Sequence, residues 1–336
     1  MYILHILKAS CLLTGGVQMD TRKIIKFGTN SFVVSLPRSF IDKFGLRKGD
    51  EVYVKEMEDS INYSPSNFSA LQKPREITIH MKNKSLEIIE TEIIWAYLVN
   101  FDTITVKCEN KFDRKKRSRI KEVLQNLAGM EIMEETVCKI TARDLININQ
   151  ISIDKTIRRI DIIVRGMIQD SMRCLREDHY ESIFDRDEDV NRMAFMTYRI
   201  MRGATQNPVL ARSLNVTFID ILTYWQIISR LEKIGDQAKR IARFARKAKY
   251  PAKMRPRLEA IYKVIFKDYE EVMKVWYMRK HEEALRLANS YKEEVRTLNK
   301  LIKDFSPTPD IVNIIENLKS MTSSIKHIAR SIIGGG

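Results

Sequence analysis

The sequence predicts a multidomain α+β protein with an N-terminal β-strand module, a small α/β middle domain and a C-terminal all-α bundle. Three patterns predict it. Short β-branched strands separated by turn residues fill the N-terminal part, and strands then alternate with helices between residues 74 and 147. After residue 151 strand patterns vanish and long amphipathic segments follow. A length of 336 residues suits two or three domains of this kind.

Composition limits the partners and the compartment. A net charge of +15 favours an anionic partner, which can be a nucleic acid, a membrane surface or a phosphate-bearing molecule, although plain solvation of the charges also stays open. The four cysteines lie far apart in the sequence without a CxxC pair, which is typical of reduced thiols in the cytoplasm. No apolar run approaches the roughly 20 residues that span a bilayer. A cytoplasmic protein that is not membrane-integral is therefore expected.

The first element is an extension over residues 1–19. It contains an apolar stretch broken by His5 and Lys8, with no cleavage site of the A-x-A type after it. Met19 stands directly before the first well-patterned strand. We therefore expect a poorly ordered extension, with Met19 as an alternative start of translation.

The N-terminal module covers residues 20–66. Basic and β-branched residues predict strands over 22–28 and 32–36, and Pro37 suits the first turn of a helix over 38–44. Gly45 follows where helices close, and residues 51–55 alternate like a half-buried strand. A unit of this size buries little core alone, so it is expected to need a partner chain or a host domain.

Four features of this module carry a resemblance. They are the Lys26-Phe27-Gly28 turn, the Ser35-Leu36-Pro37 stop, the Phe44-Gly45-Leu46 helix end and the signature Leu46-x-Lys48-Gly49-Asp50-x-Val52. Together they resemble the AbrB/SpoVT family, which includes MazE-like antitoxins. The resemblance implies a homodimer with interleaved strands, a swapped-hairpin β-barrel, whose basic face lies on DNA. The implied DNA-binding residues are Arg22, Lys23, Lys26, Arg38, Lys43, Arg47 and Lys48. The alternative is that the module only dimerises the chain or seats a protein partner.

The middle domain is predicted over residues 74–147. It holds strands at 75–80 and 103–107, helices at 88–100 and 114–127, and one or two further strands between 131 and 140. Asp113 is the expected N-cap of the second helix. The run 111–121 contains seven basic residues and one acid. This run is either a solvated helix face or a second contact with the DNA backbone.

The helical domain is predicted over residues 151–333. Breaks at Pro, Asn and Asp residues divide it into six helices, which group into two three-helix repeats over 151–248 and 255–333. The predicted helices are 151–177, 184–205, 213–248, 255–278, 280–304 and 309–332. Long helices with short connections pack antiparallel into bundles.

The third helix carries a second resemblance. Its segment from Glu232 through Gly235 and Asp236 to Ile241 resembles the E-x-I-G-D-x-A-x-x-I hallmark of PhoU proteins, and the pairing of modules is similar to archaeal PhoU-like phosphate uptake regulators. Asp187 and Asn191 repeat the four-residue spacing on the preceding helix. The resemblance implies a divalent or iron-type metal ion held by Asp187, Asn191, Glu232 and Asp236. The alternative for these residues is an ion-pair network with surrounding cations.

The second repeat departs from this pattern. Its matching positions hold Ser323 and His327 on one helix, and Lys292 and Arg296 on the other. These side chains are neutral or basic, so at most one metal site per chain is expected.

Function follows from the two resemblances. The sequence has no P-loop, GxGxxG or HExxH segment and no nucleophile–base pair, so no enzymatic activity is expected. The leading hypothesis is a DNA-binding regulator of phosphate homeostasis. The alternative is an adaptor whose helical half inhibits a phosphate transporter or a sensor kinase, with the N-terminal module only dimerising. A metal-dependent hydrolase is a third, weaker hypothesis.

Overall fold

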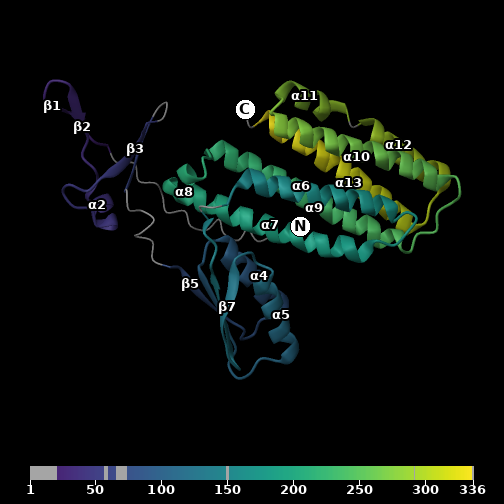
Figure 1. The fold of residues 1–336 in the computed structure, drawn as a ribbon, viewed down its shortest axis with the longest axis horizontal. Coiled ribbons are helices and arrows are strands. Elements are labelled where there is room, and N and C mark those ends of the chain that lie inside the picture. The colour runs from purple at the N-terminus through teal and green to yellow at the C-terminus, as the bar shows by residue number, and fades with distance from the viewer. Residues whose placement is uncertain (1–20, 57–59, 66–73, 149–150, 291, 335–336) are drawn as a thin grey trace. The chain divides into compact units, whose positions relative to one another are not determined.

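The computed structural model describes residues 21–56, 60–65, 74–148, 151–290 and 292–334. The chain divides into two compact units, Met1–Arg75 and Glu76–Gly336 (Figure 1). The predicted extension over residues 1–19 lies outside the described residues. None of the described helices is long and apolar enough to cross a membrane.

The first unit consists of two hairpins and one short helix. Strands β1 (Ile25–Phe27) and β2 (Ser31–Val33) pair antiparallel, as do β3 (Val52–Glu56) and β4 (Ile61–Pro65). The sequence predicted β3 but not β4, because Asn62 and Pro65 weaken the strand pattern there. The observed hairpins are those of the predicted class, in two separate two-stranded sheets.

Helix α2 (Arg38–Phe44) has the predicted bounds. Pro37 is its N-cap residue, and Gly45 ends it with a left-handed φ of 60°, which glycine adopts without a steric penalty. Gly28 and Gly49 also have positive φ, at 70° and 95°. No residue of α2 is buried.

The second unit begins with an α/β part. Its elements are β5 (Glu76–His80), α4 (Leu86–Leu98), β6 (Thr103–Lys107), α5 (Arg114–Gln125), β7 (Met130–Glu135) and β8 (Lys139–Asp144). The strand order is β5-β6-β8-β7, with β5 and β6 parallel and the other neighbours antiparallel. Helix α4 supplies the crossover that a parallel pair requires. Ile93, Ile104 and Ile140 are fully buried in this part.

Two details of the α/β part bear on the sequence predictions. Asp113 caps α5, accepting a hydrogen bond from the Lys115 amide at 3.0 Å, as predicted. The Cys108 amide donates to the Cys138 carbonyl at 3.0 Å, so two cysteines that are distant in sequence lie side by side where β6 ends and β8 begins.

The helical part of the second unit follows in one run. Its helices are α6 (Ile153–Arg173), α7 (Tyr180–Gln206), α8 (Pro208–Ser213), α9 (Phe218–Ala245), α10 (Met254–Met278), α11 (His281–Ser290), α12 (Lys292–Phe305) and α13 (Pro309–Ile333). Each of the six predicted segments is mainly helical, but two bounds were wrong: the predicted 213–248 starts at Phe218, and the predicted 280–304 is covered by α11 and α12. The short helix α8 was not predicted, and Asn207 caps it by accepting from the amides of Val209 and Leu210.

Packing within the helical part forms two groups. Helix α9 contacts α6 and α7, helix α13 contacts α10, α11 and α12, and α9 and α13 pack against each other between the groups (Figure 1). A second link is the buried Asp161 of α6, whose carboxylate accepts hydrogen bonds from Tyr269 at 2.7 Å and Tyr277 at 3.0 Å. Both tyrosines belong to α10, so the two groups share a core and a polar network.

Candidate functional site

The seven side chains predicted to bind DNA are all exposed. Arg22 and Lys23 precede β1, Lys26 lies within it, and Arg47 and Lys48 occupy the turn before β3. The Arg47 amide donates to the Asp50 carboxylate at 2.7 Å, which closes this turn. The turn therefore presents two cations on an ordered backbone.

Helix α2 contributes the other two predicted cations. Arg38 Nε lies 3.0 Å from Asp42, one helical turn away, and Lys43 Nζ lies 5.3 Å from the centre of the Phe44 ring. Both pairs are exposed and worth little in stability. The seven predicted residues thus share one small module, and Asp42 offsets the charge of one of them.

Apolar side chains of this unit are exposed as well. Phe27 is 70% exposed and Phe32 68% exposed. Eight further large apolar side chains are exposed: Ile24, Ile25, Val33, Val34, Tyr53, Val54, Ile61 and Tyr63. Strands of this length without a buried face are not stable alone in water. The single chain leaves the apolar surface of the hairpins uncovered.

In the second unit, the four predicted metal ligands lie on two adjacent helices. Asp187 and Asn191 are one turn apart on α7, and Glu232 and Asp236 are one turn apart on α9. Asn191 donates its side-chain amide to Asp187 at 3.3 Å. The charge of Asp236 raises the pKa of Asp187, and the charges of Asp187 and Asp236 raise the pKa of Glu232.

A lysine, Lys239, enters this acidic group. Its ammonium contacts Asp187 Oδ2 directly and lies 3.8 Å from Asp236 Oδ1. Arg240 Nε donates to the other oxygen of Asp236 at 2.8 Å. Burial raises the pKa of Asp187, and the hydrogen bond and charge of Lys239 oppose that rise. The two aspartates are therefore paired with cations of α9.

Glu232 has a different environment. Burial, together with the nearby Asp187 and Asp236, raises its pKa to about 7, and the hydrogen bond from Tyr198 opposes that rise. The Tyr198 hydroxyl donates to Glu232 Oε2 at 3.3 Å. Glu232 therefore holds a proton below about pH 7, which lowers the negative charge of the group there.

These residues do not fit a metal centre well. In the described ranges, no group of three or more His, Cys, Asp or Glu side chains is arranged to hold a metal ion. The carboxylates of Asp187 and Asp236 are instead paired with Lys239 and Arg240, and Asp187 also accepts a hydrogen bond from the Asn191 amide. The predicted metal site stays a prediction, and the contacts favour the alternative of an ion-pair network.

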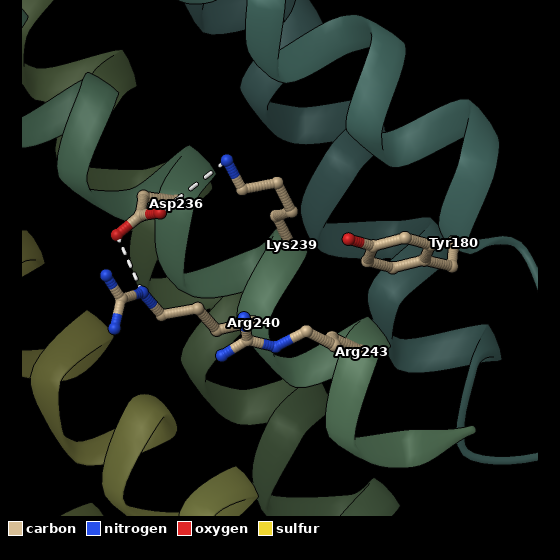
Figure 2. A pocket seen from close by; sticks show the side chains of 5 residues that line it. All are labelled: Tyr180, Asp236, Lys239, Arg240 and Arg243. Atoms are coloured by element: carbon tan, nitrogen blue, oxygen red, sulfur yellow. Dashed lines mark hydrogen bonds and ion pairs between the residues drawn. The ribbon is translucent and has the colours of Figure 1, made fainter. Parts of the chain in front are cut away.

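A pocket of about 260 Å³ opens beside this network. It is lined by Tyr180 of α7 and by Asp236, Lys239, Arg240 and Arg243 of α9. Figure 2 shows the Tyr180 hydroxyl pointing toward the side chain of Lys239 while Asp236 faces both Lys239 and Arg240. Two of the three cations that line the pocket, Lys239 and Arg240, are thus paired with Asp236.

In the second repeat, the positions that match the acidic group hold no acidic residues. His327 lies near Arg230 and Lys233 of α9, and burial together with these cations lowers its pKa. Lys292 and Arg296 are exposed on α12. No acidic counterpart of the α7–α9 group occurs at these positions.

Two buried polar sites were missed by sequence reasoning. Arg199 of α7 is 3% exposed and pairs with Asp144 of β8 at 2.8 Å. Asp268 of α10 and Glu294 of α12 each have a buried oxygen without a hydrogen-bond partner. No local pattern distinguishes these residues from surface charges on amphipathic helices, so the sequence carried no signal for them.

Comparisons with known proteins identify both parts of the chain. Residues 157–245 match the family model of the PhoU domain, and residues 25–61 match that of MazE, described as antidote-toxin recognition and bacterial antitoxin. The crystal structure of PhoU from Pseudomonas aeruginosa is similar at 18% identity with a TM-score of 0.45, over 54% of this chain and 93% of that one. No curated protein sequence matches the chain. The chain therefore carries a MazE/AbrB-like domain at its N-terminal end and a PhoU domain in its helical part.

Proposed function

We propose that this protein is a DNA-binding regulator of phosphate uptake, in which a dimer of the first unit binds DNA and the PhoU domain responds to phosphate status. The observation that carries the proposal is the presence of both domains in one chain. The phosphate link comes from the PhoU domain alone. The DNA link comes from the exposed basic hairpin module.

Charge supports the DNA link. Seven Lys or Arg side chains stand against two acids between residues 20 and 49, and all seven are exposed. Contacts from such side chains to phosphates release counterions, so affinity falls as salt rises. Contacts to phosphates position the protein on the duplex but do not distinguish one base sequence from another. A preference for one operator is therefore expected to come partly from DNA shape.

The uncovered apolar surface supports a dimer. The hairpins of one chain expose Phe27 and Phe32, which a second copy of the same module can cover. A two-fold dimer also places two sets of cations on one duplex. The same arrangement is expected to give a pseudo-palindromic operator.

The direct test is a gel shift with DNA from upstream of phosphate-transport genes, using full-length protein at several salt concentrations. The variant Arg22→Glu/Lys23→Glu/Lys26→Glu should lose most of its affinity. Its log–log salt slope should become shallower by up to about 0.9 for each DNA phosphate that the variant no longer neutralises.

The matched control is Lys247→Glu/Lys249→Glu/Lys253→Glu. It makes the same change in net charge at three exposed positions between α9 and α10. This control should keep near wild-type affinity. Equal loss in both triple variants, or no binding by the wild type at low salt, would remove the DNA link.

The alternative is an adaptor that inhibits a phosphate transporter or a sensor kinase through the PhoU domain. The PhoU match by itself is equally compatible with it. Regulation of phosphate uptake in cells separates the two hypotheses. Uptake control that survives the Arg22/Lys23/Lys26 charge reversal favours the adaptor, and control that is lost with DNA binding favours the regulator.

A further inference from the structure

The α7–α9 acidic group contains its own cation. Resemblance to PhoU proteins implies a metal ion between the acidic side chains of these two helices. Here the Lys239 ammonium reaches from α9 to Asp187 on α7. It also lies 3.8 Å from Asp236, a pair that Figure 2 shows. One ammonium thus bridges carboxylates from both helices.

The surroundings of Lys239 suit a permanent counter-ion. Its side chain is 24% exposed and that of Asp187 is 7% exposed, so the pair is largely removed from water. The ammonium also lies 5.8 Å from the centre of the Phe184 ring, within cation–π range. A buried carboxylate without a partner is costly, so a cation at this place stabilises the contact between the helices.

The remaining oxygens have other partners. Asn191 directs the N–H side of its amide at Asp187, which leaves the amide oxygen turned away from that carboxylate. Arg240 Nε donates a hydrogen bond to Asp236 Oδ2 at 2.8 Å. A divalent ion at this place would have to displace Lys239 against like-charge repulsion and also separate Arg240 from Asp236.

We propose that Lys239 is a built-in counter-ion that takes the place of a metal ion, so that the contact between α7 and α9 in this PhoU domain is independent of metal. The inference concerns the helical part alone. It does not depend on the DNA link, so either can fail without the other.

The first experiment measures metal directly in the full-length protein. Protein purified without chelator is assayed for bound metal by mass spectrometry, then titrated with Mn²⁺, Fe²⁺ and Zn²⁺ in a calorimeter. The baseline is the variant Asp187→Asn/Asp236→Asn. Wild type and variant should show the same metal content and the same heats. Stoichiometric metal held by the wild type and lost in the variant would overturn the proposal.

The second experiment measures the role of Lys239 in stability, and its control is Lys233→Met, an exposed lysine of the same helix. Lys239→Met should lower the melting temperature by roughly 3–8 °C, because it leaves the Asp187 carboxylate buried without a cation. Lys233→Met should change it by about 1 °C or less.

Adding Asp187→Asn to Lys239→Met should recover part of the loss, since the uncompensated carboxylate is then gone. This double variant also keeps the test decisive if Lys239→Met alone does not fold. Equal melting temperatures for Lys239→Met and Lys233→Met, or no recovery in the double variant, would show that Lys239 is not the counter-ion.

Discussion

Gly235 stands in the middle of α9, inside the segment that resembles PhoU proteins. A methyl group added there would meet Met167 Cε at 3.4 Å and Val164 Cγ2 at 3.8 Å, which are ordinary contacts in a core. Gly129 differs, because its φ of +81° is left-handed and an added methyl group would lie 2.6 Å from Ile146 Cδ1. Glycine is thus required at residue 129 but not by packing at residue 235.

We expect Gly235→Ala to keep or raise the free energy of unfolding, by up to about 1 kcal/mol, since alanine is the better helix former. Gly129→Ala should destabilise the protein, by about 1 kcal/mol or more, because the residue keeps a strained φ and clashes. Urea denaturation of both variants checks this. Destabilisation by Gly235→Ala of more than about 1 kcal/mol would instead point to a role of this glycine that the packing does not show.

Asp268 is an unusual carboxyl group. Burial, together with the charges of Glu294 and Glu271, raises its pKa from 3.8 to about 7. One of its oxygens is buried without a hydrogen-bond partner, as is one oxygen of Glu294. The folded protein therefore holds a proton on Asp268 between pH 4 and 7 that the unfolded chain releases.

A folded-state pKa above the unfolded value means that stability falls as pH rises from about 4 to about 7, and then levels off. Asparagine at residue 268 cannot ionise. Asp268→Asn should therefore melt at a higher temperature than the wild type at pH 8, with the difference shrinking toward pH 4. The exposed Asp185→Asn is the control, and its difference from the wild type should not follow this curve. A pH-independent difference for Asp268→Asn would contradict the assignment.

Helix α7 does more than complete the first three-helix group. Arg199 on this helix pairs with Asp144 at the end of β8, donates to the Phe101 carbonyl at 3.3 Å and lies 4.6 Å from the centre of the Tyr97 ring. All of these partners belong to the α/β part. One buried guanidinium therefore links the sheet to the helical bundle, beside the packing of α4 on α7, within the compact unit of residues 76–336.

Removing Arg199 should be costly, because Asp144 would stay buried without its partner. We expect Arg199→Met to lower the free energy of unfolding by about 3–5 kcal/mol. The double variant Arg199→Met/Asp144→Asn should lose less than the sum of the two single variants. Arg192→Met, an exposed arginine on the same helix, is the control. Additive single losses in a urea denaturation cycle would show that the two residues are not coupled.

Capping and turn preferences of individual residues predicted the helix ends that those residues set. Pro37 and Gly45 fix the bounds of α2, and Asp113 fixes the start of α5. The partners of Arg199 and Lys239 could not be predicted in this way. They depend on which face of a helix meets which neighbour, and charged residues at helical spacing look the same whether they are solvated or paired.

The whole molecule combines a basic module that exposes apolar side chains with a bundle that pairs several partly buried carboxylates with cations. In α9, Asp236 and the cations around it form a network, whereas the hairpins leave Phe27 and Phe32 largely exposed. The two resemblances in the sequence predicted both kinds of domain. They did not show that Lys239 would pair with two of the predicted metal ligands. The hallmark segment specifies its acidic residues but not the cation that contacts them.

The exposed apolar surface of the hairpins leads to a prediction about assembly. If a second copy covers it, the full-length protein is a dimer in solution, and charges placed on this surface should separate the copies. We expect Phe27→Asp/Phe32→Asp to shift the mass measured by light scattering from about twice the chain mass to that of one chain. The melting temperature of the helical part should stay within about 2 °C, since the substituted residues belong to the other compact unit.

The control Arg22→Glu/Lys26→Glu also adds negative charge to this module but removes no apolar side chain, and it should remain dimeric. A dimer that survives Phe27→Asp/Phe32→Asp would mean that the copies associate through another surface.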